Sequence, residues 1–225
     1  KYRFFQVILA IAVVMLIVSS AVFISFQGVN ISEAEYTSEM TGRTFESDGA
    51  DGSETALTEF EAWLEYSIIA DGLKETGNNV DFDKGNVKLC DYNLTQLRQL
   101  KKVKDEAKRM MFLSVILLII GFLAVKKRRM YECVVWGGVA ASVIGMVSLI
   151  LLAVSGSGIF YGVREMVFKG RYDVFFSGDD RLIALIPDNL GLRMFLIYTG
   201  VILTGLVITI IVRLISWRKT QPHKF

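Results

Sequence analysis

The sequence has 225 residues, of which 52% are hydrophobic, and its formal net charge is +2. This share of apolar residues is high for a soluble domain and favours a membrane protein, whereas the net charge says little and the distribution of the charges is informative. The apolar residues gather in four long runs at 4–26, 110–125, 134–154 and 192–212. Three runs exceed about 18 residues, enough for a helix to cross the hydrocarbon core, so the fold class is an all-α membrane protein with four transmembrane helices.

The first span is expected at 4–27. It has a basic start and no small-residue cleavage site, so it is interpreted as an uncleaved anchor rather than a signal peptide. Residues 28–109 are expected to form a small extracytoplasmic domain, built of helices and a short β-hairpin. Residues 28–100 contain fifteen Asp/Glu against five Lys/Arg, so this domain is acidic. Its leader, 28–52, is rich in Ser, Thr, Glu and Gly, which is typical of irregular chain.

Two elements are predicted inside this domain before its last helix. Ser53 is a suitable N-cap for a helix whose apolar residues recur at three- and four-residue spacing, from Leu57 to Ile68. Apolar residues on both sides of 84–86 then indicate a short hairpin.

The last helix of the domain is expected to continue into the second span at 110–125. Asp91 or Asn93 can cap it, and an apolar stripe runs from Leu94 into the membrane segment. The 110–125 run is short by itself, so this continuity makes the span long enough. A helix of this kind ties the outer domain rigidly to the membrane.

Basic residues set the expected topology. They occupy the N-terminus, the loop at 126–130 between the second span and the third at 131–155, and the tail at 214–225 after the fourth span at 191–213. Basic residues stay on the cytoplasmic side, so both termini are expected in the cytoplasm of a plasma-membrane protein. A further basic cluster lies on the opposite side of the membrane in this topology, and the three other basic sites are given more weight. The cluster consists of Lys101, Lys102, Lys104, Lys108 and Arg109.

The third span and the segment after it carry two further patterns. Small residues between Gly137 and Gly145 predict close helix packing within the bundle. In the second extracytoplasmic segment, 156–190, one helical face is apolar and the other carries Tyr161, Arg164 and Glu165, which predicts a helix lying in the membrane interface.

Several chemistries are not expected. Cys90 and Cys133 lie on opposite sides of the membrane and cannot form a disulfide. The only histidine, His223, is in the tail, and no His/Cys cluster has metal-ligand spacing, so neither a metal nor another cofactor is expected. Acidic and basic groups are missing from the middles of the spans, which disfavours an ion-coupled transporter. No nucleic-acid partner is expected, and the oligomeric state is left open.

Two segments carry a family resemblance. One runs from Tyr92 through a helix start to Val103, and the other runs from Phe160 to the Asp-Arg-Leu-Ile-Ala-Leu-Ile-Pro stretch at 180–187. With the four-span topology, they resemble the family of bacterial integral membrane proteins that includes the lipoprotein intramolecular transacylase. The resemblance implies a bacterial plasma-membrane location. It also implies acyl transfer at the outer face, from the glycerol of a lipoprotein's lipid-modified cysteine to that cysteine's own amine, with histidines moving the protons.

The sequence departs from the family pattern at the site that the resemblance implies. Gln99 and Arg164 stand where the family has histidines, and neither side chain exchanges a proton near pH 7. Glu165 and Asp180 remain as candidate catalytic carboxylates, and Arg164 with Tyr161 as candidate contacts for a lipid headgroup. Gln99 is expected to face the Arg164–Glu165 pair across a groove.

Three functions stay open at this point. The protein is a divergent relative that binds membrane lipid or a lipoprotein N-terminus, an acyltransferase that uses Glu165 or Asp180 with Arg164 as oxyanion partner, or a non-enzymatic scaffold whose acidic domain binds a partner protein.

Overall fold

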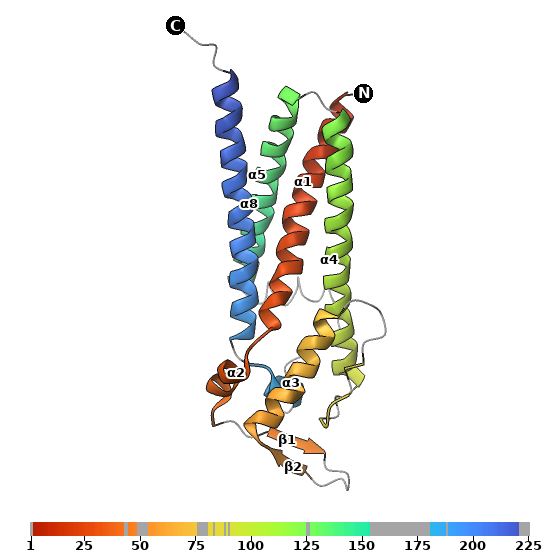
Figure 1. Cartoon of the computed structure of the whole chain (residues 1–225), viewed down its shortest axis with the longest axis vertical. Coiled ribbons are helices and arrows are strands. Elements are labelled where there is room, and N and C mark those ends of the chain that lie inside the picture. Colours follow the sequence, from red (N-terminus) through yellow and green to blue (C-terminus); the bar gives the residue numbers. More distant parts are fainter. Residues whose placement is uncertain are drawn as a thin grey trace. The chain divides into compact units, whose positions relative to one another are not determined.

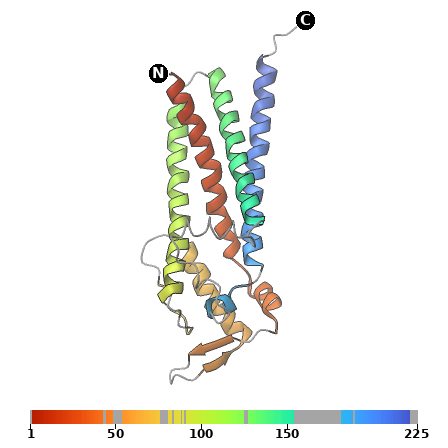
Figure 2. The same ribbon diagram turned by 180° about the vertical axis from the view of Figure 1, so that it is seen from behind.

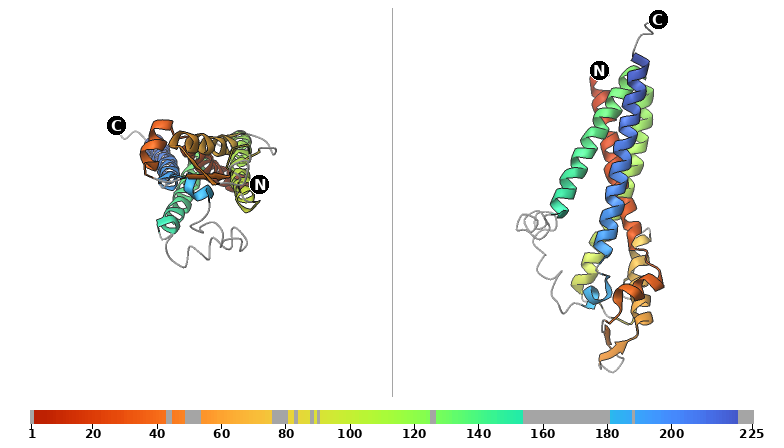
Figure 3. Two further views of the ribbon diagram at one scale, coloured as in Figure 1. Left: turned by 90° about the horizontal axis from the view of Figure 1, so that it is seen from below. Right: turned by 90° about the vertical axis from the view of Figure 1, so that its left-hand side faces the viewer.

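The structure, a computed structural model, contains four helices that are long and apolar enough to cross a membrane, as the sequence predicts. They are α1 (Tyr2–Ser25), α4 (Asp91–Ala124), α5 (Lys127–Ala153) and α8 (Leu190–Thr220), and Figures 1 and 3 show each as one continuous ribbon. The structure describes residues 2–42, 45–48, 54–75, 81–82, 84–87, 89, 91–124, 127–153, 181–187 and 189–220.

The chain divides into two compact units. We call the first the bundle unit, which comprises Lys1–Ser25, Glu106–Ser155 and Leu196–Phe225. We call the second the head unit, which comprises Phe26–Asp105 and Gly156–Phe195. The helix α4 belongs to both, because it runs without a break from Asp91 to Ala124. The predicted continuity of the last domain helix with the second span is therefore confirmed.

Glycines on α5 allow close helix packing in the bundle unit. A Cβ on Gly137 would lie 2.6 Å from the carbonyl oxygen of Ala10 in α1, and one on Gly145 would lie 2.5 Å from a methyl group of Ile202 in α8. A Cβ on Gly138 would overlap the hydroxyl group of Thr209. The predicted role of the small residues in packing within the bundle is thus confirmed, since backbones can approach closely only where side chains are absent.

Polar side chains within the bundle are satisfied by their own helices. The hydroxyl groups of Ser114, Ser142 and Thr209 each donate to the carbonyl oxygen four residues earlier, at 2.6, 2.8 and 2.8 Å. Large apolar side chains cover the outer faces, for example Leu123, which is 85% exposed. An unpaired hydroxyl group is costly in hydrocarbon, so this arrangement suits helices surrounded by lipid.

The head unit begins with a 3-10 turn, η1 (Phe26–Val29), and the helix α2 (Glu33–Met40), which lies in the leader expected to be irregular. Ser32 caps α2, and its side chain accepts from the backbone N–H of Glu35 at 3.4 Å. The expectation of irregular chain was therefore wrong for these residues. Tyr36 and Met40 provide the reason: both are completely buried, so the core selects the helical conformation.

The helix α3 (Glu59–Lys74) has its N-cap at Thr58, five residues after the predicted N-cap Ser53. Thr58 and Glu61 form a capping box: the backbone N–H of Thr58 donates to a carboxylate oxygen of Glu61 at 2.8 Å, and the N–H of Glu61 donates to the Thr58 hydroxyl at 3.3 Å. This reciprocal pairing satisfies backbone donors at the start of the helix. The predicted start at Ser53 was wrong because the intervening residues form a strand.

The β-hairpin is displaced from its predicted position. Strand β1 (Phe45–Asp48) pairs antiparallel with β2 (Glu54–Leu57), with Phe45 opposite Leu57 (Figure 2). The described residues between 81 and 89 contain no strand. There the backbone N–H groups of Asn86 and Val87 donate to the carboxylate of Glu65 in α3, at 2.7 and 3.4 Å. The hairpin predicted around 84–86 was wrong because these donors bind a side chain instead of a neighbouring strand.

The core of the head unit joins segments that are far apart in the sequence. Tyr36 and Tyr66 stack with ring centroids 5.2 Å apart. The hydroxyl of Tyr36 donates to the carbonyl oxygen of Leu185 at 2.9 Å, and that of Tyr66 to Val29 at 2.6 Å. Leu185 belongs to the short helix α7 (Arg181–Leu185), which packs against α3 and β1 (Figure 2). Two buried hydroxyl groups therefore connect α2 to α7 and α3 to η1.

Candidate functional site

Of the predicted site residues, the structure describes only Gln99, which lies on α4. Tyr161, Arg164, Glu165 and Asp180 lie outside the described residues. The groove expected between Gln99 and the Arg164–Glu165 pair therefore stays a prediction.

Gln99 lies on the outward side of α4 within the head unit. Its side chain is half-buried, whereas Leu97 and Lys101, two residues before and after it, are only 3% and 5% exposed. A step of two residues turns a helix by about 200°, so Gln99 lies nearly opposite that buried face. An amide at this position donates and accepts hydrogen bonds but exchanges no proton near pH 7.

The inward face of α4 carries two buried lysines whose role the sequence analysis did not identify. The ammonium group of Lys104 donates to the carbonyl oxygens of Leu73, Lys74 and Glu75, the last two at 2.8 and 2.9 Å.

Lys101 donates to the same Glu75 carbonyl oxygen at 2.9 Å. These carbonyls form the C-terminal end of α3, where unpaired acceptors and the helix dipole favour a cation. Lys101 and Lys104 therefore cap α3 and connect it to α4.

Asp105 completes this arrangement, because its carboxylate lies 3.4 Å from Lys101 and 3.7 Å from Lys104. Two of the five cations that conflicted with the expected topology, Lys101 and Lys104, thus have structural partners inside the head unit. One sequence signal could have identified them: both fall on the apolar stripe of α4, where an unpaired lysine would be costly to bury.

The Asp-Arg-Leu-Ile-Ala-Leu-Ile-Pro stretch is a structural element in its described part, 181–187. Leu182 and Leu185 are 4% and 2% exposed, and Pro187 is among the largest fully buried side chains. Together with the Tyr36 hydrogen bond to Leu185, this burial makes α7 part of the core. The pattern that carries the family resemblance is therefore a packing pattern in this region.

An ion pair connects the first turn of α8 to α2. The guanidinium group of Arg193 lies 2.8 Å from the carboxylate of Glu35. Burial raises the pKa of the nearby Tyr66 phenol, and the positive charge of Arg193 opposes this shift. The phenol therefore stays protonated near neutral pH and serves as a hydrogen-bond donor rather than a base.

Nothing among the described residues suggests metal chemistry. No group of three or more His, Cys, Asp or Glu side chains within them could hold a metal ion. Cys133, at the start of α5, is a buried free cysteine.

These features define a class: an integral membrane protein with four spanning helices and a head unit connected to one of them through a continuous helix. The same fold occurs in the membrane integral lipoprotein intramolecular transacylase Lit from Bacillus cereus. The TM-score is 0.71 at 12% sequence identity, covering 96% of this chain and 96% of that chain.

Two altered forms of that protein also match. The form with a histidine replaced by arginine has a TM-score of 0.69 at 12% identity and covers 96% of this chain and 92% of its own. The form with the same histidine replaced by alanine has a TM-score of 0.69 at 13% identity, with 97% and 94% covered.

No family model and no curated protein sequence matches this chain. The likeness to the transacylase family inferred from two short segments is confirmed at the level of the fold. At 12–13% identity the solved structures fit a divergent relative.

Proposed function

We propose that this protein binds the lipid-modified N-terminus of lipoproteins at the outer face of a bacterial plasma membrane and does not itself transfer the acyl chain. The observation that carries the proposal is the fold match over 96% of both chains. A match of that extent includes the head unit as well as the spans. Binding of a membrane-embedded substrate next to the head unit is therefore the function that the fold best supports.

The missing imidazoles argue against turnover. Migration of an acyl chain from a glycerol oxygen to the cysteine amine forms a C–N bond and breaks a C–O bond. The amine must lose a proton, and the departing glycerol oxygen must gain one. Gln99 cannot carry out either step, and the single histidine, His223, follows the fourth span. The chain therefore retains a fold suited to binding this substrate but lacks histidine side chains at the two positions where the resemblance implies proton transfer.

Substrate binding in this proposal combines two kinds of contact. The acyl chains would lie against the apolar outer faces of the bundle, such as that of α4, where Leu113 is 45% exposed and falls on the same side of the helix as Gln99. The polar cysteine end would lie beside the outward face of α4 that carries Gln99, whose amide can bond to the ester or amide carbonyl of the ligand.

Two measurements on the full chain test the proposal. Expression in a bacterium that lacks its own transacylase, followed by mass spectrometry of lipoprotein N-termini, is expected to show unchanged diacylglyceryl-cysteine. Purified protein in nanodiscs is expected to bind a fluorescent diacylglyceryl-cysteine peptide saturably. The same peptide without acyl chains is expected not to bind.

Each measurement has an outcome against the proposal. Appearance of the lyso form would reject the non-catalytic interpretation and favour an acyltransferase that uses Glu165 or Asp180. Equal binding of acylated and unacylated peptides would reject lipoprotein recognition and favour the scaffold interpretation, in which the acidic head unit binds a partner protein.

A further inference from the structure

Charge is sharply divided along the sequence between the start of the head unit and the apolar part of α4. Residues 28–97 contain fifteen Asp/Glu and four Lys/Arg, whereas residues 98–109 contain six Lys/Arg and two Asp/Glu. The second stretch ends directly before Met110, where the apolar part of α4 begins. Positive charge is therefore concentrated at the boundary between the polar and the apolar parts of one continuous helix.

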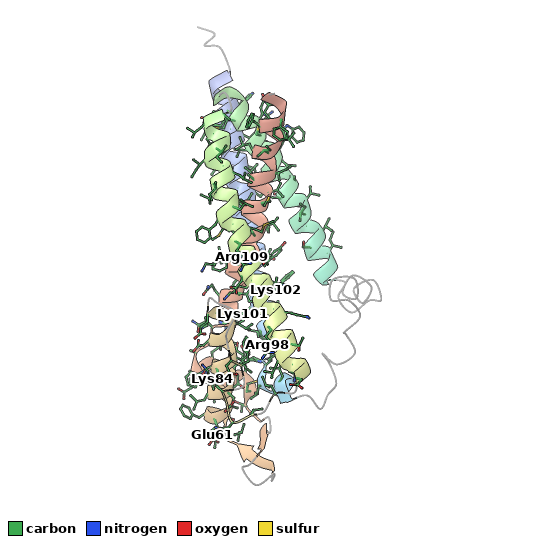
Figure 4. The ribbon with its side chains drawn as sticks, turned by 90° about the vertical axis from the view of Figure 1, so that its right-hand side faces the viewer. Glu61, Lys84, Arg98, Lys101, Lys102 and Arg109 are labelled. Carbon is green, nitrogen blue, oxygen red and sulfur yellow. The ribbon has the colours of Figure 1, made fainter. Side chains whose placement is uncertain are left out.

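The structure separates these cations by function. Lys101 and Lys104 are buried and cap α3, as described above. Arg98, Lys102 and Arg109, which are labelled on α4 in Figure 4, are exposed. Spacings of four and seven residues turn a helix by about 40° and 340°, so these three side chains lie on one face. We call this surface the basic face of α4.

The distances along the helix match the headgroup region of a bilayer. Arg109 directly precedes the apolar segment, and Lys102 lies eight residues before Met110, roughly 12 Å along the axis. A headgroup layer is about 5–8 Å thick, and the field of an anionic surface extends about 8 Å further at physiological salt. Arg109 is therefore placed to contact phosphates directly, and Lys102 to be attracted by the surface.

The present partner of Arg109 does not prevent such a contact. Arg109 lies 2.7 Å from Glu106, but the two side chains are 68% and 50% exposed. Ion pairs at such exposed positions contribute little to stability, and a guanidinium group has further donors for a phosphate oxygen.

We infer that the basic face of α4 binds the headgroups of anionic glycerophospholipids in the leaflet next to its N-terminal half. The segregation of charge favours lipid over protein as the partner, because the cations cluster in the stretch of α4 that directly precedes its apolar part. The interaction holds the head unit, which is otherwise acidic, against a surface of like charge that would repel it. It does not depend on lipoprotein binding.

The test is photo-crosslinking of the full chain in nanodiscs made from equal parts of phosphatidylcholine and phosphatidylglycerol. A photoactivatable group is placed on the headgroup of one lipid or the other, and the crosslinked peptides are mapped by mass spectrometry. We expect the α4 peptide that covers 98–109 to label several-fold more with the anionic probe than with the zwitterionic probe, and high salt to reduce this preference. The basic loop at 126–130 serves as a reference within the same molecule.

Charge variants locate the effect. The triple variant R98E/R109E/K102E is expected to lose the preference for the anionic probe in the α4 peptide and to keep it at 126–130. Loss of one cation near a membrane surface corresponds to about a fivefold change in lipid association at most. The control is Lys84→Glu, which reverses one charge at an exposed head-unit position outside this face, and Lys102→Glu alone is its matched comparison on the face.

Two outcomes would overturn the inference. One is equal labelling of the α4 peptide by the two probes in the unaltered chain, a result that does not require any variant to fold. The other is an equal loss of preference in Lys84→Glu and in the triple variant, which would indicate a general charge effect. If the triple variant does not fold, the milder Lys102→Gln/Arg109→Gln pair replaces it, and retention of the full preference in that pair would also contradict the inference.

Discussion

The ammonium group of Lys104, on α4, donates a hydrogen bond to the carbonyl oxygen of Leu73, in the last turn of α3. The same group bonds to the carbonyl oxygens of Lys74 and Glu75, and Lys104 is 4% exposed. One side chain thus satisfies three acceptors at the end of α3, and Lys101 donates to the last of them as well. The stability of the α3–α4 connection follows from this arrangement.

Replacement of Lys104 by methionine is therefore expected to destabilise the end of α3. Buried carbonyl groups without a donor cost about 1–3 kcal/mol, and the methionine retains most of the apolar packing. Hydrogen exchange of the backbone amides at 70–75 should become faster by the factor that corresponds to this loss of free energy. Lys102→Met, at an exposed neighbouring position, is the control and should leave these rates unchanged; equal acceleration in both variants would contradict the capping role.

The packing of α5 against α8 leads to a second prediction. Gly138→Ala places a methyl group where the Thr209 hydroxyl lies, so the helices must separate or the threonine must move. Overpacking of this kind costs about 1–3 kcal/mol, and thermal unfolding in detergent should occur at a lower temperature. Gly200→Ala in α8 is the matched control, because a Cβ there meets nothing within 4 Å. A Gly138→Ala protein as stable as Gly200→Ala would show that the two helices do not pack as described.

The capping box of α3 predicts a pH dependence. The backbone N–H and the hydroxyl of Thr58 hold the pKa of the Glu61 carboxyl below its ordinary value. Because the folded pKa is depressed, the stabilisation is complete above the unfolded pKa and is lost as the pH falls through the folded value. Amides in the first turn of α3 should therefore lose protection, relative to their intrinsic exchange rates, only on acidification below about pH 4.5.

The variant Glu61→Gln provides the comparison. A neutral amide has no ionisation to lose, so protection of this turn should be weaker than in the unaltered chain at neutral pH and independent of pH in the acidic range. Protection that still falls with acid in Glu61→Gln would assign the effect to another carboxyl group.

Gln99 and Arg164 lead to a prediction about catalysis. Gln99→His alone is expected to give no lyso-form lipoprotein, because the resemblance places a histidine at each of the two positions. The double variant Gln99→His/Arg164→His should yield a detectable amount in a host without its own transacylase, measured by mass spectrometry of lipoprotein N-termini. Product from the single variant, or none from a stably expressed double variant, would contradict the alignment of these two positions.

The sequence determined the four spans, because hydrophobicity is a local property of consecutive residues and a long apolar run has few stable alternatives to a membrane helix. It also determined the continuity of α4, since the apolar stripe continues from Leu94 into the membrane segment, and the close packing of α5, since small residues recur on its surface. The likeness to the transacylase fold was recognisable from two short segments together with the four-span topology.

The tertiary structure decided what the polar residues of the head unit do. Lys104 donates to a carbonyl oxygen 31 residues away, and Glu65 accepts from a backbone N–H 21 residues away. The Tyr36 hydroxyl donates to a carbonyl oxygen 149 residues away. None of these partners is indicated by spacing along the chain. The hairpin forms at β1 and β2 rather than around 84–86 because the donors of Asn86 and Val87 are bound by Glu65. Burial forces each polar group to find a partner, but only the folded chain determines which partner lies within reach.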